Sequence, residues 1–218
     1  MTATSLDFSQ KPDLLPLARV AGALQAVAAP LNIEYFLMGA AARDLLLRHA
    51  HNIQPSRLTE DVDFAVMVGD WNAFEALRSA LVAGGDFNSR PGPATHRLRH
   101  SSGLPLDIVP FGGIERADRT IAWPPDHAEV FDCFGAREAF DVSLTVLLPE
   151  RVRLQVAPIP ALALLKLFDA TGIQRVLAIL LPEADEDGTL LLAGQSGIDL
   201  ETARRLDEAF CDELADAM

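Results

Sequence analysis

Short apolar runs of strand length alternate along this chain with segments of helical periodicity, and this alternation limits the folds open to it. The helical segments place apolar residues three or four positions apart, whereas the strand-like runs are short and rich in Val, Ile, Leu and Phe. In chain order the pattern predicts helix, strand, helix, strand, helix and further strands, followed by helices. We therefore expect an α/β (α+β) fold, a mixed sheet with flanking helices and a helical C-terminal part.

The individual elements follow from periodicity and from Gly, Pro and capping residues. The predicted helices cover residues 13–29, 40–48, 71–82, 161–180 and 199–217. The predicted strands cover residues 33–38 and 62–68, and two hairpins pair 96–99 with 104–110 and 141–147 with 152–156. Asp70 is suited to cap the helix that follows it.

Charge limits the classes of partner that the chain can bind. Its 218 residues carry a formal net charge of −13, which argues against binding nucleic acid through bulk charge alone. A nucleic-acid or nucleotide contact would need a local basic patch, for which the segment 96–100 (His-Arg-Leu-Arg-His) is the best candidate. The alternative is that this segment is an ordinary exposed hairpin strand.

The acidic residues are concentrated in residues 183–218, whose only basic residues are Arg204 and Arg205. This shift in charge predicts a break near Pro182. We divide the chain into a main domain at 1–157 and a helical C-terminal region at 158–218. No apolar run reaches the roughly 18 uncharged residues of a membrane span, and the N-terminus lacks the pattern of a signal peptide. Two cysteines make neither a disulfide framework nor a zinc site, so we expect a cytoplasmic protein without a membrane partner.

Three aspartates stand at apolar strands and are the sharpest chemical feature. Asp61 and Asp63 are two residues apart at the start of a strand, so their carboxylates face the same side and are candidates to hold metal ions. Asp107 interrupts the apolar run 104–111 and is a candidate for a third carboxylate. The alternatives are a solvated strand entrance for the pair and an exposed-face residue for Asp107.

Several basic residues and one glycine turn could contact phosphate. Gly39 and Ala40 join a predicted strand to a helix, where backbone N–H groups and the positive helix end attract anions. Arg43 lies on that helix and Arg57 precedes the aspartate pair, although isolated arginines are more often surface residues. Lys166 lies in a very apolar helix, where it either extends to solvent or points into a cleft and neutralises a polyphosphate.

Together these residues resemble the DNA polymerase β-like nucleotidyltransferase superfamily. That pattern has a glycine motif at a strand–helix turn, here within 36–47, then Asp-x-Asp on the next strand, here within 57–64, and a third Asp on a later strand, here within 106–111. The segments 107–115, 121–125 and 164–168 resemble the AbiEii/AbiGii-type nucleotidyltransferases, many of which are toxins of toxin–antitoxin pairs. The similarity covers roughly residues 30–170.

The resemblance implies a transferase of the 2.7.7 class, which transfers a nucleoside monophosphate from a nucleoside triphosphate to an acceptor hydroxyl. Its catalytic domain would be residues 1–157. Two Mg²⁺ ions would be held by Asp61, Asp63 and Asp107. Gly39, Ala40, Arg43, Arg57 and Lys166 would contact the triphosphate.

The implied acceptor is an RNA end, particularly tRNA, and a small molecule, as in aminoglycoside nucleotidyltransferases, is the other candidate. A cognate antitoxin is the implied protein partner. The chain departs from the family in two places, because Ala40 replaces one glycine of the usual pair and the distal Lys/Arg-Asp-x-x-Asp segment is not found. The alternative function is therefore a catalytically inactive nucleotide-binding or interaction module of the same fold.

Overall fold

The computed structural model describes residues 5–54, 61–89, 96–124 and 127–168. The chain divides into two units, residues 1–166 and 167–218, and all described residues except 167 and 168 belong to the first. The described helices are α1 (Leu15–Ala28), α2 (Gly39–His49), α3 (Trp71–Ala83), α4 (Ala136–Asp141) and α5 (Ile159–Phe168). The described strands are β1 (Ser5–Asp7), β2 (Glu34–Met38), β3 (Val62–Met67), β4 (Phe87–Ser89), β5 (Arg97–His100), β6 (Pro105–Phe111), β7 (Thr120–Ala122), β8 (Val130–Asp132), β9 (Leu144–Leu147) and β10 (Arg153–Val156).

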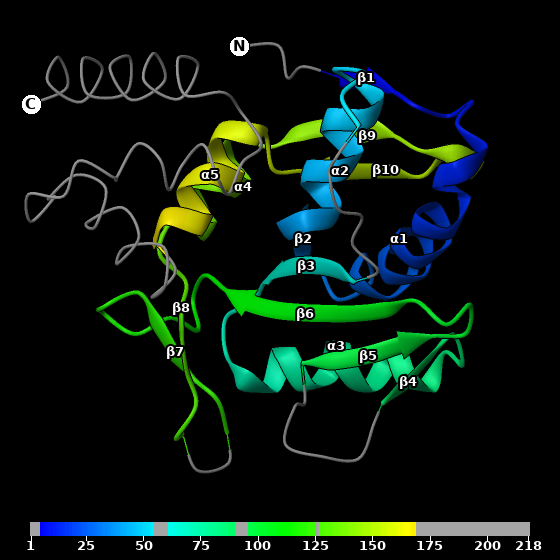
Figure 1. The fold of residues 1–218 in the computed structure, drawn as a ribbon. Helices are drawn as coiled ribbons and strands as arrows, with labels where there is room; N and C mark the ends of the chain where they lie inside the picture. The colour runs from blue at the N-terminus through cyan, green and yellow to red at the C-terminus, as the bar shows by residue number, and fades with distance from the viewer. Residues whose placement is uncertain (1–4, 55–60, 90–95, 125–126, 169–218) are drawn as a thin grey trace, which may run out of the picture. The chain divides into compact units, whose positions relative to one another are not determined.

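One large sheet organises the described residues, in the strand order β1-β9-β10-β2-β3-β6-β5-β4, and β7 and β8 form a separate two-stranded ribbon. The large sheet is mixed, since β3 pairs with β6 in parallel and with β2 in antiparallel orientation. Figure 1 shows β3 and β6 side by side, with α3 near β4 and β5. The predicted mixed α/β sheet with flanking helices is confirmed.

The longer elements form close to where periodicity predicts them. α1, α2 and α3 differ from the predicted helices by a few residues at most, and Asp70 accepts the backbone N–H of Ala73 as the predicted cap of α3. Both predicted hairpins form, with β5 antiparallel to β6 and β9 antiparallel to β10. None of the helices in the described ranges is long and apolar enough to cross a membrane.

The short elements were not anticipated. β1, β4, β7 and β8 are each three residues long, which is too short for a detectable alternation. Residues 136–141 form α4 and bury Ala136 and Ala139 one helical turn apart, so the strand predicted at 141–147 is shorter and begins at Leu144. The predicted helix at 161–180 begins earlier, at Ile159; its portion beyond residue 168, and the helix predicted at 199–217, lie outside the described residues.

Aromatic rings fill the sheet face on which Asp63 and Asp107 lie. Phe36 is paired with Ala65, and strand alternation therefore puts Phe36 on the same face as Asp63, two positions away. Phe36 packs edge-on against Phe111, and Phe140 of α4 contacts both rings. The part of this face beyond the aspartates is therefore packed with apolar side chains.

Candidate active site

The pairing of β3 with β6 puts Asp63 directly opposite Asp107. Their Cα atoms are register partners in a parallel ladder, and partners in such a ladder point to the same face of the sheet. Both residues are half-buried, while their strand neighbours Val62, Phe64, Leu106 and Ile108 are buried on the other face. Two carboxylates thus lie side by side at the edge of an apolar core.

This environment makes the charged form of Asp63 costly. Burial, followed by the negative charges of Asp107 and Asp61, raises the pKa of Asp63 from 3.8 to about 6, and the positive charge of Arg97 opposes this rise. A cation bound beside Asp63 would stabilise its charged form, because the positive charge offsets both the burial and the repulsion that raise the pKa. Perturbed carboxyl groups of this kind are concentrated at functional sites.

Arg97 on β5 is the basic partner of this acidic site. It lies opposite Asp107 in the antiparallel ladder and donates Nε to Oδ1 at 2.8 Å and an Nη to Oδ2 at 2.7 Å, a two-bond ion pair. The side chain of Asp107 is only 13% exposed and that of Arg97 is 53% exposed. Arg97 therefore covers one carboxylate of the site from the solvent side, and a cation bound there must share Asp107 with it.

Asp61 lies just before β3 and is exposed. It is close enough to act on the pKa of Asp63, but it lines a different pocket, of about 300 Å³, together with residues of α1 and α2. Within the described part of the chain, no three Asp, Glu, His or Cys side chains gather closely enough to hold a metal ion. The structure thus brings Asp63 and Asp107 together and puts Asp61 beside them; convergence of all three stays a prediction.

Gly39 connects the glycine turn directly to Asp63. It has a φ of +67°, which suits glycine, and a Cβ on it would meet the carboxylate of Asp63, with Cγ only 2.9 Å away. Register explains the contact, because Met38 at the end of β2 is the partner of Asp63. The turn that begins α2 therefore packs directly against Asp63.

A cavity of about 590 Å³ adjoins this turn. Its wall includes Gly39 and Ala40 of the turn, Arg43 of α2 and Lys166 of α5. The remaining lining is Met38, Asp132, Ile159, Leu162, Ala163 and Leu165. Four of the five residues predicted to contact a triphosphate thus share one cavity; the fifth, Arg57, lies outside the described residues.

The sequence reasoning missed two polar residues of this region. The sequence pattern puts Arg97 in a basic cluster suited to nucleic acid, whereas the structure pairs it with Asp107. His100 of the same cluster is buried against Phe87. Counting pairs outward from the turn at 101–103 would have placed Arg97 opposite Asp107. Asp132 in the cavity wall had no signal, because it lies on a three-residue strand.

We expect Arg97→Gln to destabilise the protein in a pH-dependent way. Without the guanidinium, the aspartates repel each other unopposed and the pKa of Asp63 rises further above 6, so the loss should be about 1–2 kcal/mol at pH 8. The loss should shrink toward pH 4, where a protonated Asp63 needs no counter-charge. Chemical denaturation at both pH values, at low salt and without divalent cations, measures it.

Arg99→Gln is the matched control for this prediction. Arg99 is two residues further along β5 and donates to the carbonyl of Gly103 rather than to an aspartate. Its replacement should change stability equally at both pH values. An equal, pH-independent loss in the two variants would mean that Arg97 does not neutralise the aspartates.

Comparisons with known proteins give distant likenesses only. No protein-family model matches the chain, and no curated protein does. The solution structure of the antibiotic-resistance factor ANT(2'')-Ia is 14% identical, with 93% of this chain and 95% of that chain covered and a TM-score of 0.37. A nucleotidyltransferase-like protein from Paracoccidioides brasiliensis is 18% identical (92% and 91% covered, TM-score 0.45).

The Thermotoga maritima CCA-adding enzyme, complexed with tRNA, is 23% identical over 47% of this chain and 22% of that chain, with a TM-score of 0.29. Identities and TM-scores this low do not assign a reaction to the site, so its chemistry must be argued from the residues of this chain.

Proposed function

We propose that this protein is a metal-dependent nucleotidyltransferase, which transfers a nucleoside monophosphate from a nucleoside triphosphate to an acceptor hydroxyl and releases pyrophosphate. The observation that carries the proposal is the contact of the Gly39 turn with Asp63. The same turn lines the cavity that includes Arg43 and Lys166, and a helix start of this kind can bind phosphate, which supports the proposal. These are the components that phosphoryl-transfer chemistry requires.

The carboxylates fit divalent metal ions. Asp63 and Asp107 lie in direct register, burial and mutual repulsion raise the pKa of Asp63, and carboxylate oxygens are the ligands that Mg²⁺ prefers. We propose that Asp61, Asp63 and Asp107 hold two Mg²⁺ ions. Such ions, when bound, neutralise the charge that develops on the transferred phosphoryl group and align the attacking and leaving oxygens.

The remaining residues act on the triphosphate. The N–H groups at the start of α2, at Gly39 and Ala40, would bind phosphate oxygens, with Arg43 and the predicted Arg57 nearby. Lys166 lines the same cavity and would neutralise the leaving pyrophosphate. Asp107 would also accept a proton from the acceptor hydroxyl, and Arg97 orients that carboxylate through two hydrogen bonds.

An RNA end, particularly that of tRNA, is the acceptor we propose, on the resemblance to the AbiEii/AbiGii-type proteins. A toxin role with a cognate antitoxin rests on that same resemblance. A small-molecule hydroxyl is the other acceptor class.

Transfer is tested by incubating the full chain with each α-labelled nucleoside triphosphate, Mg²⁺ and total RNA. We expect one triphosphate to label an RNA species and an equal amount of pyrophosphate to be released. Replacing RNA by an aminoglycoside mixture tests the small-molecule class. Binding of a triphosphate with Mg²⁺, without transfer to either acceptor pool, would instead favour the inactive nucleotide-binding module.

A further inference from the structure

Asp132, at the end of β8, is a negative side chain on the wall of the cavity that contains the Gly39 turn, Arg43 and Lys166. A carboxylate repels phosphate, so Asp132 has no place at the phosphate end of a bound nucleotide. The same cavity wall includes Ile159, Leu162 and Leu165 of α5, which offer apolar contact to a flat ring. The cavity therefore offers contacts to a nucleobase as well as to phosphate.

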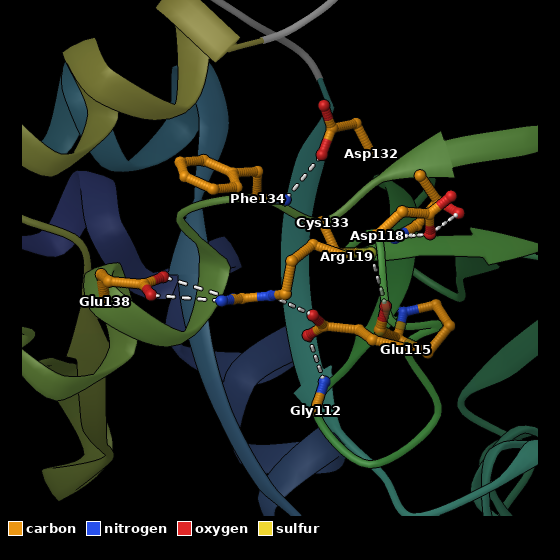
Figure 2. Close-up of polar contacts among 10 residues, drawn as sticks. Gly112, Glu115, Asp118, Arg119, Asp132, Cys133, Phe134 and Glu138 are labelled. Carbon is orange, nitrogen blue, oxygen red and sulfur yellow. Dashed lines mark hydrogen bonds and ion pairs between the residues drawn. The ribbon is translucent and has the colours of Figure 1, made fainter.

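The carboxylate of Asp132 is held in place by its surroundings. Its Oδ1 accepts the backbone N–H of Phe134 at 2.7 Å. Figure 2 shows the support behind it, where Arg119 is bonded to both Glu115 and Glu138 and its carbonyl accepts the N–H of Cys133. Within the described residues, only Oδ1 of Asp132 accepts a protein hydrogen bond, and the side chain is exposed, so Oδ2 is free to accept from water or from a ligand.

Arg119, Glu115 and Glu138 form a cluster of charged hydrogen bonds that restrains the ribbon. The side chain of Glu115 is only 7% exposed; its Oε1 accepts the N–H of Gly112 at 2.7 Å and its Oε2 accepts Nε of Arg119 at 2.5 Å. Charge-assisted bonds of this kind are stronger and more directional than neutral ones. The ribbon that carries Asp132 is thereby tied both to the end of β6 and to α4.

We propose that the cavity binds the nucleobase against α5 and that Asp132 selects a base which presents an exocyclic amine. The inference rests on the proposed function and deepens it. An ionised carboxylate only accepts hydrogen bonds, so it attracts an amine and opposes a carbonyl oxygen at the same position. Asp132 is exposed, and a base seated against α5 would shield its carboxylate from water. Two acceptors left face to face there would cost affinity, by about tenfold or more.

The test compares triphosphates that differ at the amine. ATP and GTP are each compared with ITP, and CTP with UTP, by calorimetric titration of the full chain with Mg²⁺ and no acceptor. We expect the preferred amine-bearing triphosphate to bind at least about tenfold more tightly than its counterpart. In Asp132→Asn this preference should fall below about threefold or reverse, because the amide can keep its oxygen on Phe134 and donate from its nitrogen to a carbonyl.

Asp118→Asn is the matched control. Asp118 precedes β7 in the same ribbon region, its Oδ1 also bonds locally, to Thr120, and it does not line the cavity, so its replacement should leave the preference unchanged. Equal affinities within every pair, or a preference retained in Asp132→Asn, would overturn the inference while the proposed function stands. A second result would also overturn the inference. Ribonucleotides would bind more tightly than the matching deoxynucleotides, there would be no preference for the amine, and this ribose preference would be lost in Asp132→Asn, because Asp132 would then contact the 2′-hydroxyl. No binding of any triphosphate would overturn the proposed function and this inference together.

Discussion

Asp63→Asn should abolish nucleotide transfer, lowering the rate by at least about a thousandfold, while the fold is retained. The amide has the shape of the carboxylate but lacks its charge. The site would therefore hold too weakly the metal ions whose positive charge phosphoryl transfer requires. Transfer assays with the triphosphate identified for the wild type measure the effect. Wild-type transfer by this variant would falsify the proposed mechanism.

The same substitution should stabilise the protein above pH 6 when no divalent cation is present. With a pKa of about 6 in the folded state and near 3.8 in the unfolded chain, Asp63 holds a proton in the folded state that the unfolded state has released. Wild-type stability should therefore fall as pH rises from about 4 to 6 and then level off, and the Asp63→Asn substitution removes this fall. Because Asp63 is half-buried, we expect a gain of about 2 kcal/mol at pH 8 and almost none at pH 4.

Asp70→Asn is the control for this stability effect. Asp70 caps α3 through the N–H of Ala73, and Asn is about as good a cap as Asp. It should show no gain at high pH. Equal pH profiles for wild type and Asp63→Asn would show that neither burial nor repulsion raises the pKa of Asp63, and would remove the main reason to expect a cation beside it.

Gly39→Ala should disrupt the site from the backbone. The methyl group would occupy the position of the Asp63 carboxylate, and alanine would have to adopt a φ of +67°. We expect a loss of about 2–4 kcal/mol in the free energy of unfolding, together with loss of nucleotide binding, because Asp63 or the turn must move. Denaturant unfolding and triphosphate titration measure the two effects.

Gly85→Ala isolates the conformational part of that loss. Gly85 has a φ of +84°, and a Cβ there would have no atom within 4 Å. Its replacement should cost about 1 kcal/mol, from backbone conformation alone, and should leave nucleotide binding intact. Equal losses in the two variants, with binding kept in both, would mean that the contact between Gly39 and Asp63 plays no part in the site.

The elements that were predictable are those with enough residues to show a period. α1, α3 and β3 each contain several apolar residues at helical or alternating spacing, and local propensity agrees with the tertiary context. The three-residue strands were not predictable, because their residues are extended only through pairing with distant partners, as β1 is with β9. α4 is six residues long and depends on the packing of Phe140 against Phe36 and Phe111.

Local sequence patterns are enough to predict which residue types the site can use and on which elements they lie: Asp63 at the start of an apolar strand, Gly39 at a strand–helix turn, and Lys166 in an apolar helix. Which of these residues meet depends on long-range pairing. The register of β3 with β6 and β2 brings Asp63 to Asp107 and Gly39, and that of β5 with β6 brings Arg97 to Asp107. Register depends on pairings between residues far apart in the chain, and a shift of one residue would turn each side chain to the opposite face.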